Sequence, residues 1–177
     1  MKKLVIAAFA AMLGIAANAA TVTWGVSSVT DSPDVAKAAG WVAYVMDAST
    51  FDTFAELGGN EVAAYAAANA IATGATTVSR GAAGVSITGG NFAANEVVST
   101  YMVVFNNSVA ANATYYAYTS EAGVTISEGG ANGTINFGTF AAATSTTGGW
   151  TQTVPEPTSG LLMLVGLGAL ALRRKRA

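Results

Sequence analysis

TVTWGVSSV, residues Thr21–Val29, is the stretch that decides the fold class. Its apolar residues Val22, Trp24 and Val26 alternate with small or polar residues, which is the period of a half-buried β-strand. Segments of the same kind return after Thr76 and continue towards the C-terminus. The sequence therefore indicates a mainly β protein.

Further strand-like runs are short and evenly spaced, and glycine or asparagine clusters such as Gly89-Gly90-Asn91 separate them. The run 41–46 is apolar at successive positions, which is typical of a central strand buried on both faces. Short strands at such regular intervals are typical of sandwiches and barrels. We expect strands over 41–46, 76–79, 83–88, 96–105, 114–120, 123–127 and 134–140, and a last one over 150–153.

One alanine-rich segment, residues 51–73, interrupts the β pattern. Thr53 and Glu56 have the spacing of a capping box, which predicts a helix start. A second helix is expected from Glu61 to about Ala72, with Gly74 as its C-terminal stop. We therefore expect a single β-sandwich or jelly-roll-like domain with one helical segment. The alternative is an open α+β sheet with the helix packed on one face.

Residues 1–19 have the layout of a secretory signal peptide. Two lysines precede the apolar run 4–17, and Ala17-Asn18-Ala19 has the A-x-A pattern of a cleavage site. A membrane helix is the alternative, but a span needs about 20 apolar residues and this run is shorter. We expect signal peptidase to cut after Ala19, with Ala20 as the second choice, which leaves residues 20–150 as a β-rich exported domain.

The C-terminal end holds three features in a fixed order. A linker, residues 151–159, contains two prolines that keep it extended. The apolar run 160–172 follows, and its length of about 20 Å as a helix falls short of a bilayer core of about 30 Å, which favours a temporary membrane helix. By the positive-inside rule, the final cations stay cytoplasmic. The residues concerned are Pro155, Glu156 and Pro157 in the linker and Arg173, Arg174, Lys175 and Arg176 in the basic tail of the segment 160–177.

Over residues 154–177, these features resemble the PEP-CTERM sorting domain of Gram-negative bacteria. The resemblance implies retention at the inner membrane and recognition by an exosortase, a membrane-embedded cysteine transpeptidase-like enzyme. It also implies export, in a family whose members are often linked to extracellular polysaccharide or biofilm. The apolar run is shorter than the family pattern, and the resemblance carries no information about residues 20–150.

Charge is distributed unevenly along the chain. Six of the 8 cationic residues lie in residues 1–19 and in the basic tail, so that Lys37 and Arg80 alone remain against the 10 acidic residues from Asp31 to Glu156, a net charge of −8 over residues 20–159. This balance argues against nucleic acid as a partner, because phosphate contacts need lysine and arginine. The chain has no cysteine and no histidine, which excludes a thiolate nucleophile and the commonest general base. We expect a protein that is not an enzyme and needs no cofactor or metal.

Carboxylates nevertheless occur in near pairs. A pair can serve a glycosidase as acid and base, and a trio of aspartates can bind calcium. The structural alternative is stronger, because acids are common at turns and helix starts. The pairs are Asp31 with Asp34, Asp47 with Asp52, and Glu56 with Glu61; the calcium candidates are Asp31, Asp34 and Asp47.

Aromatic residues offer a second kind of site. On the strand expected over 114–120, Tyr116 and Tyr118 share one face. Exposed aromatic rings are good platforms for stacking on sugars, so these two tyrosines and Trp150 are candidates for glycan contact. The alternative is that one face of this strand belongs to the core, which we favour because aromatics are generally enriched in strands.

Together these features predict an exported, exosortase-processed protein with a structural or adhesive role. It is expected at the cell surface or in the extracellular matrix after transient retention at the inner membrane. Its expected partners are signal peptidase, the exosortase-like enzyme and extracellular polysaccharide. The alternatives are a carbohydrate-binding module of the cell envelope and, third, a carboxylate-dependent hydrolase.

Overall fold

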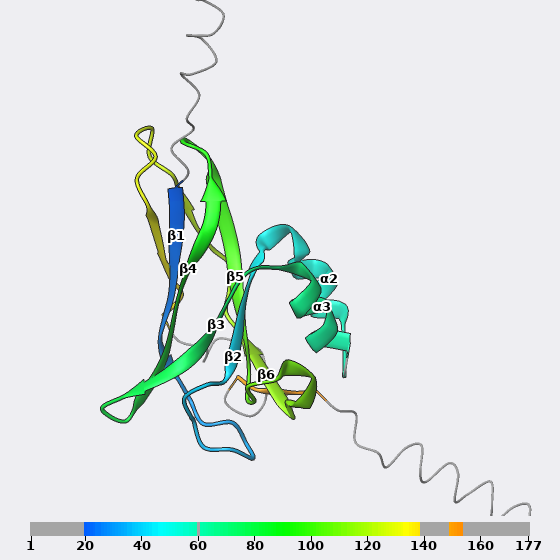
Figure 1. The fold of residues 1–177 in the computed structure, drawn as a ribbon. Coiled ribbons are helices and arrows are strands. Elements are labelled where there is room, and N and C mark those ends of the chain that lie inside the picture. The colour runs from blue at the N-terminus through cyan, green and yellow to red at the C-terminus, as the bar shows by residue number, and fades with distance from the viewer. Residues whose placement is uncertain (1–19, 60, 139–148, 154–177) are drawn as a thin grey trace, which may run out of the picture.

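The computed structural model describes residues 20–59, 61–138 and 149–153. In this part of the chain, strands form one sheet in the order β8-β1-β4-β3-β2-β5-β6-β9, and β7 pairs with β5 (Figure 1). The mainly β class is confirmed. The strands are β1 Ala20–Val29, β2 Val42–Asp47, β3 Ala70–Ser79, β4 Ala82–Phe92, β5 Val97–Phe105, β6 Tyr115–Tyr118, β7 Ala122–Thr125, β8 Gly133–Asn136 and β9 Thr151–Gln152.

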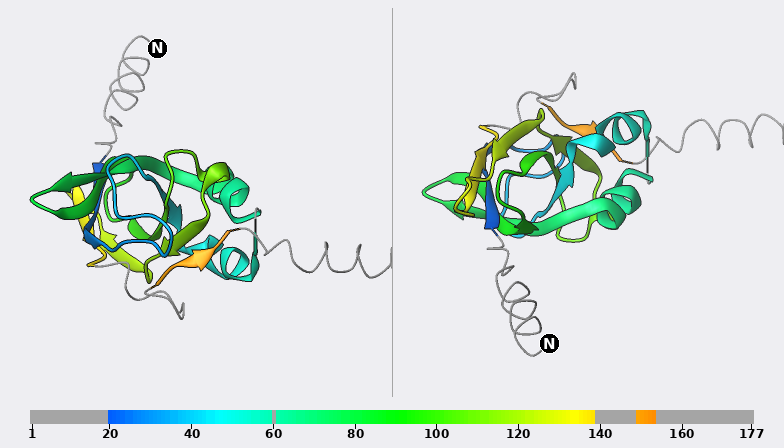
Figure 2. Two further views of the ribbon diagram at one scale, coloured as in Figure 1. Left: turned by 90° about the horizontal axis from the view of Figure 1, so that it is seen from below. Right: turned by 90° about the horizontal axis from the view of Figure 1, so that it is seen from above.

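The sheet curls around a single interior, and Figure 2 shows the strands arranged around it. It turns at β3, because Val42–Met46 of β2 pair with the first half of β3 and Ala82–Val85 of β4 pair with the second half. The two sides of the sheet meet where β8 packs against β7. A Cβ added to Gly133 would lie 2.9 Å from Cγ1 of Val124, so these two strands are in close contact. The expected sandwich is thus realised as one curled sheet.

Strand β5 is buried on both faces, which explains its nearly continuous apolar run. Met102 and Val104 face the interior of the curled sheet. Tyr101, Val103 and Phe105 face outwards into a second apolar cluster. Strand β2 lies beside β5, and its side chains are likewise shared between the interior and the outer cluster. This agrees with the central strand predicted over 41–46.

Two short helices, α2 Phe51–Glu56 and α3 Glu61–Asn69, cover that second cluster (Figure 1). Phe54 of α2 is 1 % exposed and Val62 of α3 is 0 % exposed. Two 3-10 turns, η1 Ala48–Thr50 and η2 Ala110–Asn112, lie next to them. The helices therefore pack on one outer face of the sheet, as the open-sheet alternative expected for its helix.

Two expectations for the helical segment are wrong. Thr53 does not begin a helix, because α2 already starts at Phe51 and Thr50 is its N-cap residue. Helix α3 ends at Asn69, where β3 begins, and does not continue to Ala72. Pairing with β2 accounts for this difference: Ala72 lies opposite Val45 in the sheet, so backbone hydrogen bonds across the sheet override the helix propensity of the alanines.

The expected roles of two glycine sites are also corrected. Gly74 lies within β3 and not at a helix end; a Cβ there would lie 2.6 Å from Cγ1 of Ile87. The turn expected at Gly89-Gly90-Asn91 is part of β4, where Gly89 pairs with Val22 of β1. Glycine is needed at these positions for close packing, since a side chain would meet a neighbour.

The β3–β4 hairpin projects from the body of the molecule (Figure 1). Its two turn residues both have positive φ, 51° at Arg80 and 79° at Gly81, as in a type I′ turn. Asparagine or glycine is usual at the first of these positions. Arginine in this left-handed conformation costs about 1 kcal/mol.

The folded part reaches Thr153, beyond the boundary expected at residue 150. The last strand predicted over 150–153 is present as β9, which pairs with β6. No helix within the described residues is long and apolar enough to cross a membrane. Other expectations fall outside these residues: the signal peptide with Ala17 and Ala19, the motif Pro155-Glu156-Pro157, the apolar run 160–172 and the basic tail 173–176.

Candidate functional site

Tyr116 and Tyr118 lie on one face of β6, as the sequence predicts, but helix α2 covers that face. Their ring centroids are 6.4 Å apart and the rings are stacked. The ring of Phe54 lies 5.9 Å from that of Tyr116 and 5.5 Å from that of Tyr118. Tyr116 is 5 % exposed, so its ring stabilises the contact between helix and sheet and offers no surface to a sugar.

Trp150 belongs to the other core, inside the curled sheet. It is 2 % exposed, and its ring packs edge-on against Trp41 at a centroid distance of 5.4 Å. Its indole N–H donates to the hydroxyl oxygen of Thr30 at 3.3 Å. Trp150 therefore lies in a different cluster from Tyr116 and Tyr118, and the structure does not bring the three glycan candidates together into a binding platform.

The aromatic layer under α2 also contains Tyr101, whose hydroxyl group shares a hydrogen bond of 3.0 Å with Thr50. Burial raises the pKa of Tyr101 to about 12, although the hydrogen bond to Thr50 opposes the shift. Burial also raises the pKa of Tyr116. Both phenols remain protonated near neutral pH, as expected for structural groups.

A polar network around Asn106 connects the loop before β2 to the β5–β6 connection. The Asn106 amide nitrogen lies 2.8 Å from Oδ1 of Asp34, 3.1 Å from Oγ of Ser32 and 2.9 Å from Oγ1 of Thr114. Its amide oxygen accepts the backbone N–H groups of Thr114 and Tyr115, each at 3.0 Å. Thr114 in turn donates its hydroxyl to Asp34. Sequence analysis missed this network, because its members are far apart in the chain.

The other carboxylates found by sequence analysis serve local structure. Asp31 accepts the backbone N–H of Lys37 at 2.8 Å, and Asp47 accepts that of Ser49 at 2.9 Å. Asp52, Glu56 and Glu61 are exposed on α2 and α3. Among the described residues, no three histidine, cysteine, aspartate or glutamate side chains lie together in a group that could hold a metal ion.

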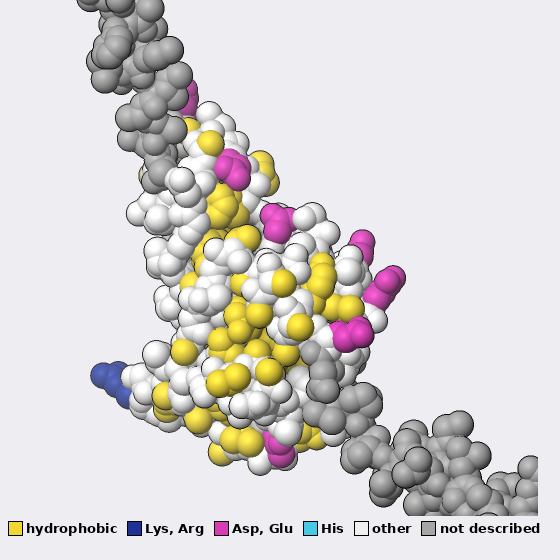
Figure 3. Space-filling model, turned by 45° about the vertical axis from the view of Figure 1, so that its right-hand side comes forward, with side chains coloured by type: hydrophobic (Ala, Val, Ile, Leu, Met, Phe, Trp, Pro, Cys, Tyr) yellow, Lys and Arg dark blue, Asp and Glu magenta, His cyan; other side chains and the backbone are white. Residues whose placement is uncertain are grey.

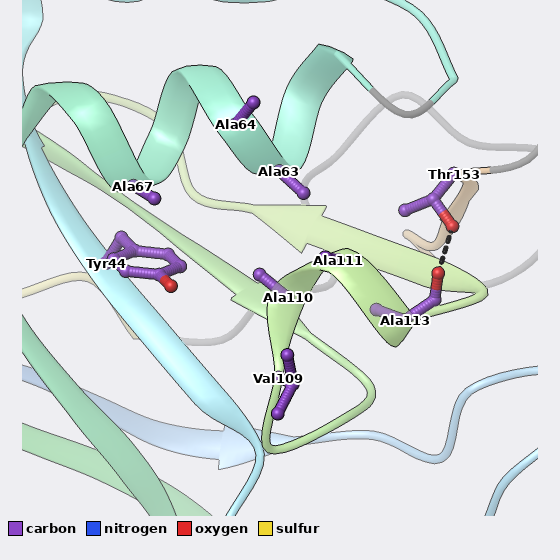
Figure 4. A pocket seen from close by; sticks show the side chains of 9 residues that line it. All are labelled: Tyr44, Ala63, Ala64, Ala67, Val109, Ala110, Ala111, Ala113 and Thr153. Atoms are coloured by element: carbon purple, nitrogen blue, oxygen red, sulfur yellow. Dashed lines mark hydrogen bonds between the residues drawn. The ribbon is translucent and has the colours of Figure 1, made fainter.

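A pocket of about 300 Å³ lies between α3 and η2 (Figure 4). Small apolar side chains line most of it, and the hydroxyl of Thr153, which donates to the carbonyl of Ala113, lies at one side. Tyr44 is the titratable residue of this lining. Such a pocket suits an apolar contact better than a chemical reaction. Its lining residues are Tyr44, Ala63, Ala64, Ala67, Val109, Ala110, Ala111, Ala113 and Thr153.

Sequence analysis missed this alanine-lined pocket. In the sequence, the alanines of α3 indicate helix propensity, and those of η2 lie between the strands expected over 96–105 and 114–120. Alanine gives no signal for a pocket, because the same residue suits a tightly packed helix contact. The position of η2 opposite α3 follows from tertiary structure, which brings the two alanine clusters together.

Comparison with known families gives one match: residues 153–176 match the model of the PEP-CTERM protein-sorting motif. The motif confirms the resemblance and implies an exported protein that is targeted to exosortase, a membrane-associated enzyme. Comparison with curated proteins and with solved structures gives no match. Thr153 is both the last described residue of the fold and the first residue of the motif.

Proposed function

We propose that this chain is a surface or matrix protein with a structural or adhesive role and no catalytic activity. Signal peptidase removes residues 1–19, and the exosortase-like enzyme processes the C-terminal segment. The chief support is the sorting motif, whose first residue, Thr153, is also the last described residue of the β domain. The domain is therefore the part that processing delivers to the cell exterior.

A non-catalytic role agrees with how the domain uses its polar groups. Asp34 is held in the Asn106 network, and Asp31 and Asp47 accept backbone N–H groups. The chain has no histidine or cysteine to act as base or nucleophile. The pocket beside α3 has an alanine-rich lining. These observations favour a scaffold over a carboxylate-dependent hydrolase.

Tyr116 and Trp150 are buried and Tyr118 is half-buried, which argues against a carbohydrate-binding module built on these three rings. Contact with extracellular polysaccharide is still compatible with the proposal, through the polar outer surface or through attachment at the processed C-terminus. An array of purified glycans separates these two routes, because attachment through the processed end requires no binding by the folded domain.

Mass spectrometry of protein recovered from the cell exterior tests the processing step. We expect the mature wild-type chain to lack residues 1–19 and the basic tail. Pro155→Ala combined with Pro157→Ala should keep the tail and accumulate at the inner membrane. Thr77→Ala, an exposed change in β3, serves as the control and should be processed normally. Recovery of surface protein with an intact tail would contradict the processing proposal.

Removal of the protein from its host tests the structural role. We expect less retained extracellular material or weaker adhesion, with recovery when the wild-type chain is restored. Restoration by the proline double variant should fail if surface delivery is needed. An unchanged matrix and unchanged adhesion in the deletion strain would argue against a structural role.

A further inference from the structure

Two distinctive surfaces lie at opposite ends of the domain. Figure 2 shows the β3–β4 hairpin at one end and the helices α2 and α3 at the other. The hairpin presents Val78, which is 44 % exposed, and the cation Arg80 at its turn. Within the described part of the chain, the Arg80 side chain makes no hydrogen bond or ion pair with another residue. The hairpin end is thus apolar and positively charged.

The helical end has complementary properties. Its pocket of about 300 Å³ is lined by alanines and by Val109, which is 51 % exposed. Glu61 is exposed at the first turn of α3, one turn before the lining residue Ala64. In Figure 3, acidic side chains lie along the side of the molecule opposite the projecting basic tip. This end thus combines an apolar hollow with an exposed carboxylate, Glu61, one helical turn away from the lining.

We propose that a second copy of this chain occupies the pocket, with its β3–β4 hairpin inserted between α3 and η2. In this arrangement, Val78 contacts Val109 and the alanines, and Arg80 lies near Glu61. The local charges favour this contact, because Arg80 and Glu61 have opposite signs and align the two surfaces, whereas the net negative charge of each copy opposes association elsewhere. The two surfaces differ, so the contact is head-to-tail, and a bound pair still has one free pocket and one free hairpin for further copies.

The backbone of the turn is an independent observation that singles out Arg80. Its φ of 51° lies in the left-handed region, where asparagine or glycine is the usual residue. An unfavourable conformation at a residue with no partner in the described domain points to a role outside that domain. This gives an unusual test, because Arg80→Asn should improve the turn while it removes the cation.

Sedimentation velocity of the purified full chain over a dilution series tests the proposal. We expect wild type to form dimers and larger species that dissociate as salt rises, because screening weakens the charge contact. Arg80→Asn should weaken association about tenfold or more, as at a central interface contact, and should raise the melting temperature. Lys37→Asn removes the other cation of the domain, lies in the loop before β2 and is the matched control; it should associate like wild type.

A mixing experiment distinguishes head-to-tail contact from a symmetric dimer. The exposed side chain of Ala67 points into the pocket (Figure 4), so Ala67→Trp fills the pocket and leaves the hairpin intact, whereas Arg80→Asn leaves the pocket intact. Each variant alone should be mainly monomeric, and their mixture should form one-to-one pairs with no larger species. Monomeric wild type at all concentrations, or loss of association in Lys37→Asn equal to that in Arg80→Asn, would overturn the proposal. So would a dimer that both pocket and hairpin variants leave unchanged.

This inference deepens the proposed structural role and rests on it for its biological meaning. The association of purified protein does not depend on export or processing. A monomeric chain that is still processed and retained outside the cell would remove the head-to-tail contact and leave the proposed function standing. Assembly of the purified chain in solution, together with no effect of gene deletion on the matrix, would support the head-to-tail contact and contradict the proposed function.

Discussion

Trp24 of β1 donates its indole N–H to the hydroxyl oxygen of Thr100 on β5 across the interior of the curled sheet, at 3.0 Å. Both side chains are 0 % exposed. The two strands are not neighbours in the sheet, so this hydrogen bond joins its opposite walls. It satisfies the one polar atom of a large indole ring that would otherwise be buried without a partner.

Thr100→Val is therefore expected to lower the free energy of unfolding by about 1–3 kcal/mol, because it leaves the Trp24 N–H unsatisfied in the core. Urea denaturation measures this change. Trp24→Phe combined with Thr100→Val should cost less than the sum of the single changes, since neither polar partner remains. Additive effects in this double-mutant cycle would show that the hydrogen bond contributes little.

Asn106→Ala should also destabilise the domain, by about 1–3 kcal/mol, because the part-buried backbone N–H groups of Thr114 and Tyr115 lose their acceptor. Asn112→Ala is the matched control: Asn112 is exposed at the end of η2, and its substitution should change stability by less than about 0.5 kcal/mol. Thermal unfolding of both variants checks the difference. Equal stability of the two variants would contradict the structural importance of the network.

Gly74→Ala is expected to destabilise by about 1–3 kcal/mol, because the new Cβ would overlap the side chain of Ile87. The nearest atom, Cγ1 at 2.6 Å, is close to the backbone of Ile87 and cannot move away freely. Shortening the neighbour in Ile87→Ala should reduce the additional cost of Gly74→Ala. If Gly74→Ala lowers stability by the same amount in wild type and in Ile87→Ala, the loss comes from the backbone of β3 and not from the contact with Ile87.

Stability should fall at high pH because of Tyr101. Its pKa rises from 10.0 to about 12 on folding, so the folded state holds a proton that the unfolded state releases first. The stabilising contribution is complete below pH 10.0 and is lost as pH rises towards about 12. Tyr116 has a pKa shifted in the same direction by burial and acts in the same sense. Urea denaturation at several pH values measures the loss.

Tyr101→Phe provides the control for this pH effect. The variant loses the hydrogen bond to Thr50 and should be less stable near neutral pH. Its stability should fall less steeply between pH 10.0 and about 12, because one of the shifted groups is gone. An alkaline loss as steep as that of wild type would show that other groups cause it.

The strands with strong local patterns could be predicted from the sequence. Val22 and Trp24 do alternate with outward residues on β1, and the apolar run 41–46 is a central strand. The end of α3 could not be predicted, because Ala70 and Ala72 favour a helix locally and adopt a strand through pairing with β2. Local helix or strand propensity carries no information about the pairing of β3 with β2.

The candidate site shows the same limit. The shared face of Tyr116 and Tyr118 follows from the period of a strand and is confirmed, but nothing local predicts that Phe54 covers them. The sorting motif was recognisable because its features are contiguous in sequence. The pocket and the Asn106 network depend on residues that meet only after folding, so they had no comparable signal.

Because β9 lies at the C-terminal end of the domain, it is the last strand to join the sheet during export. When the chain crosses a membrane with its N-terminus leading, β6 remains an open edge until Thr151 and Gln152 emerge and pair with it. Trp150 fills the interior beside Trp41 at the same stage. The residues that close the fold are thus the last to arrive before the sorting motif. The fold is therefore completed at nearly the same time as the sorting motif reaches the membrane, and the progress of translocation sets the time of both events.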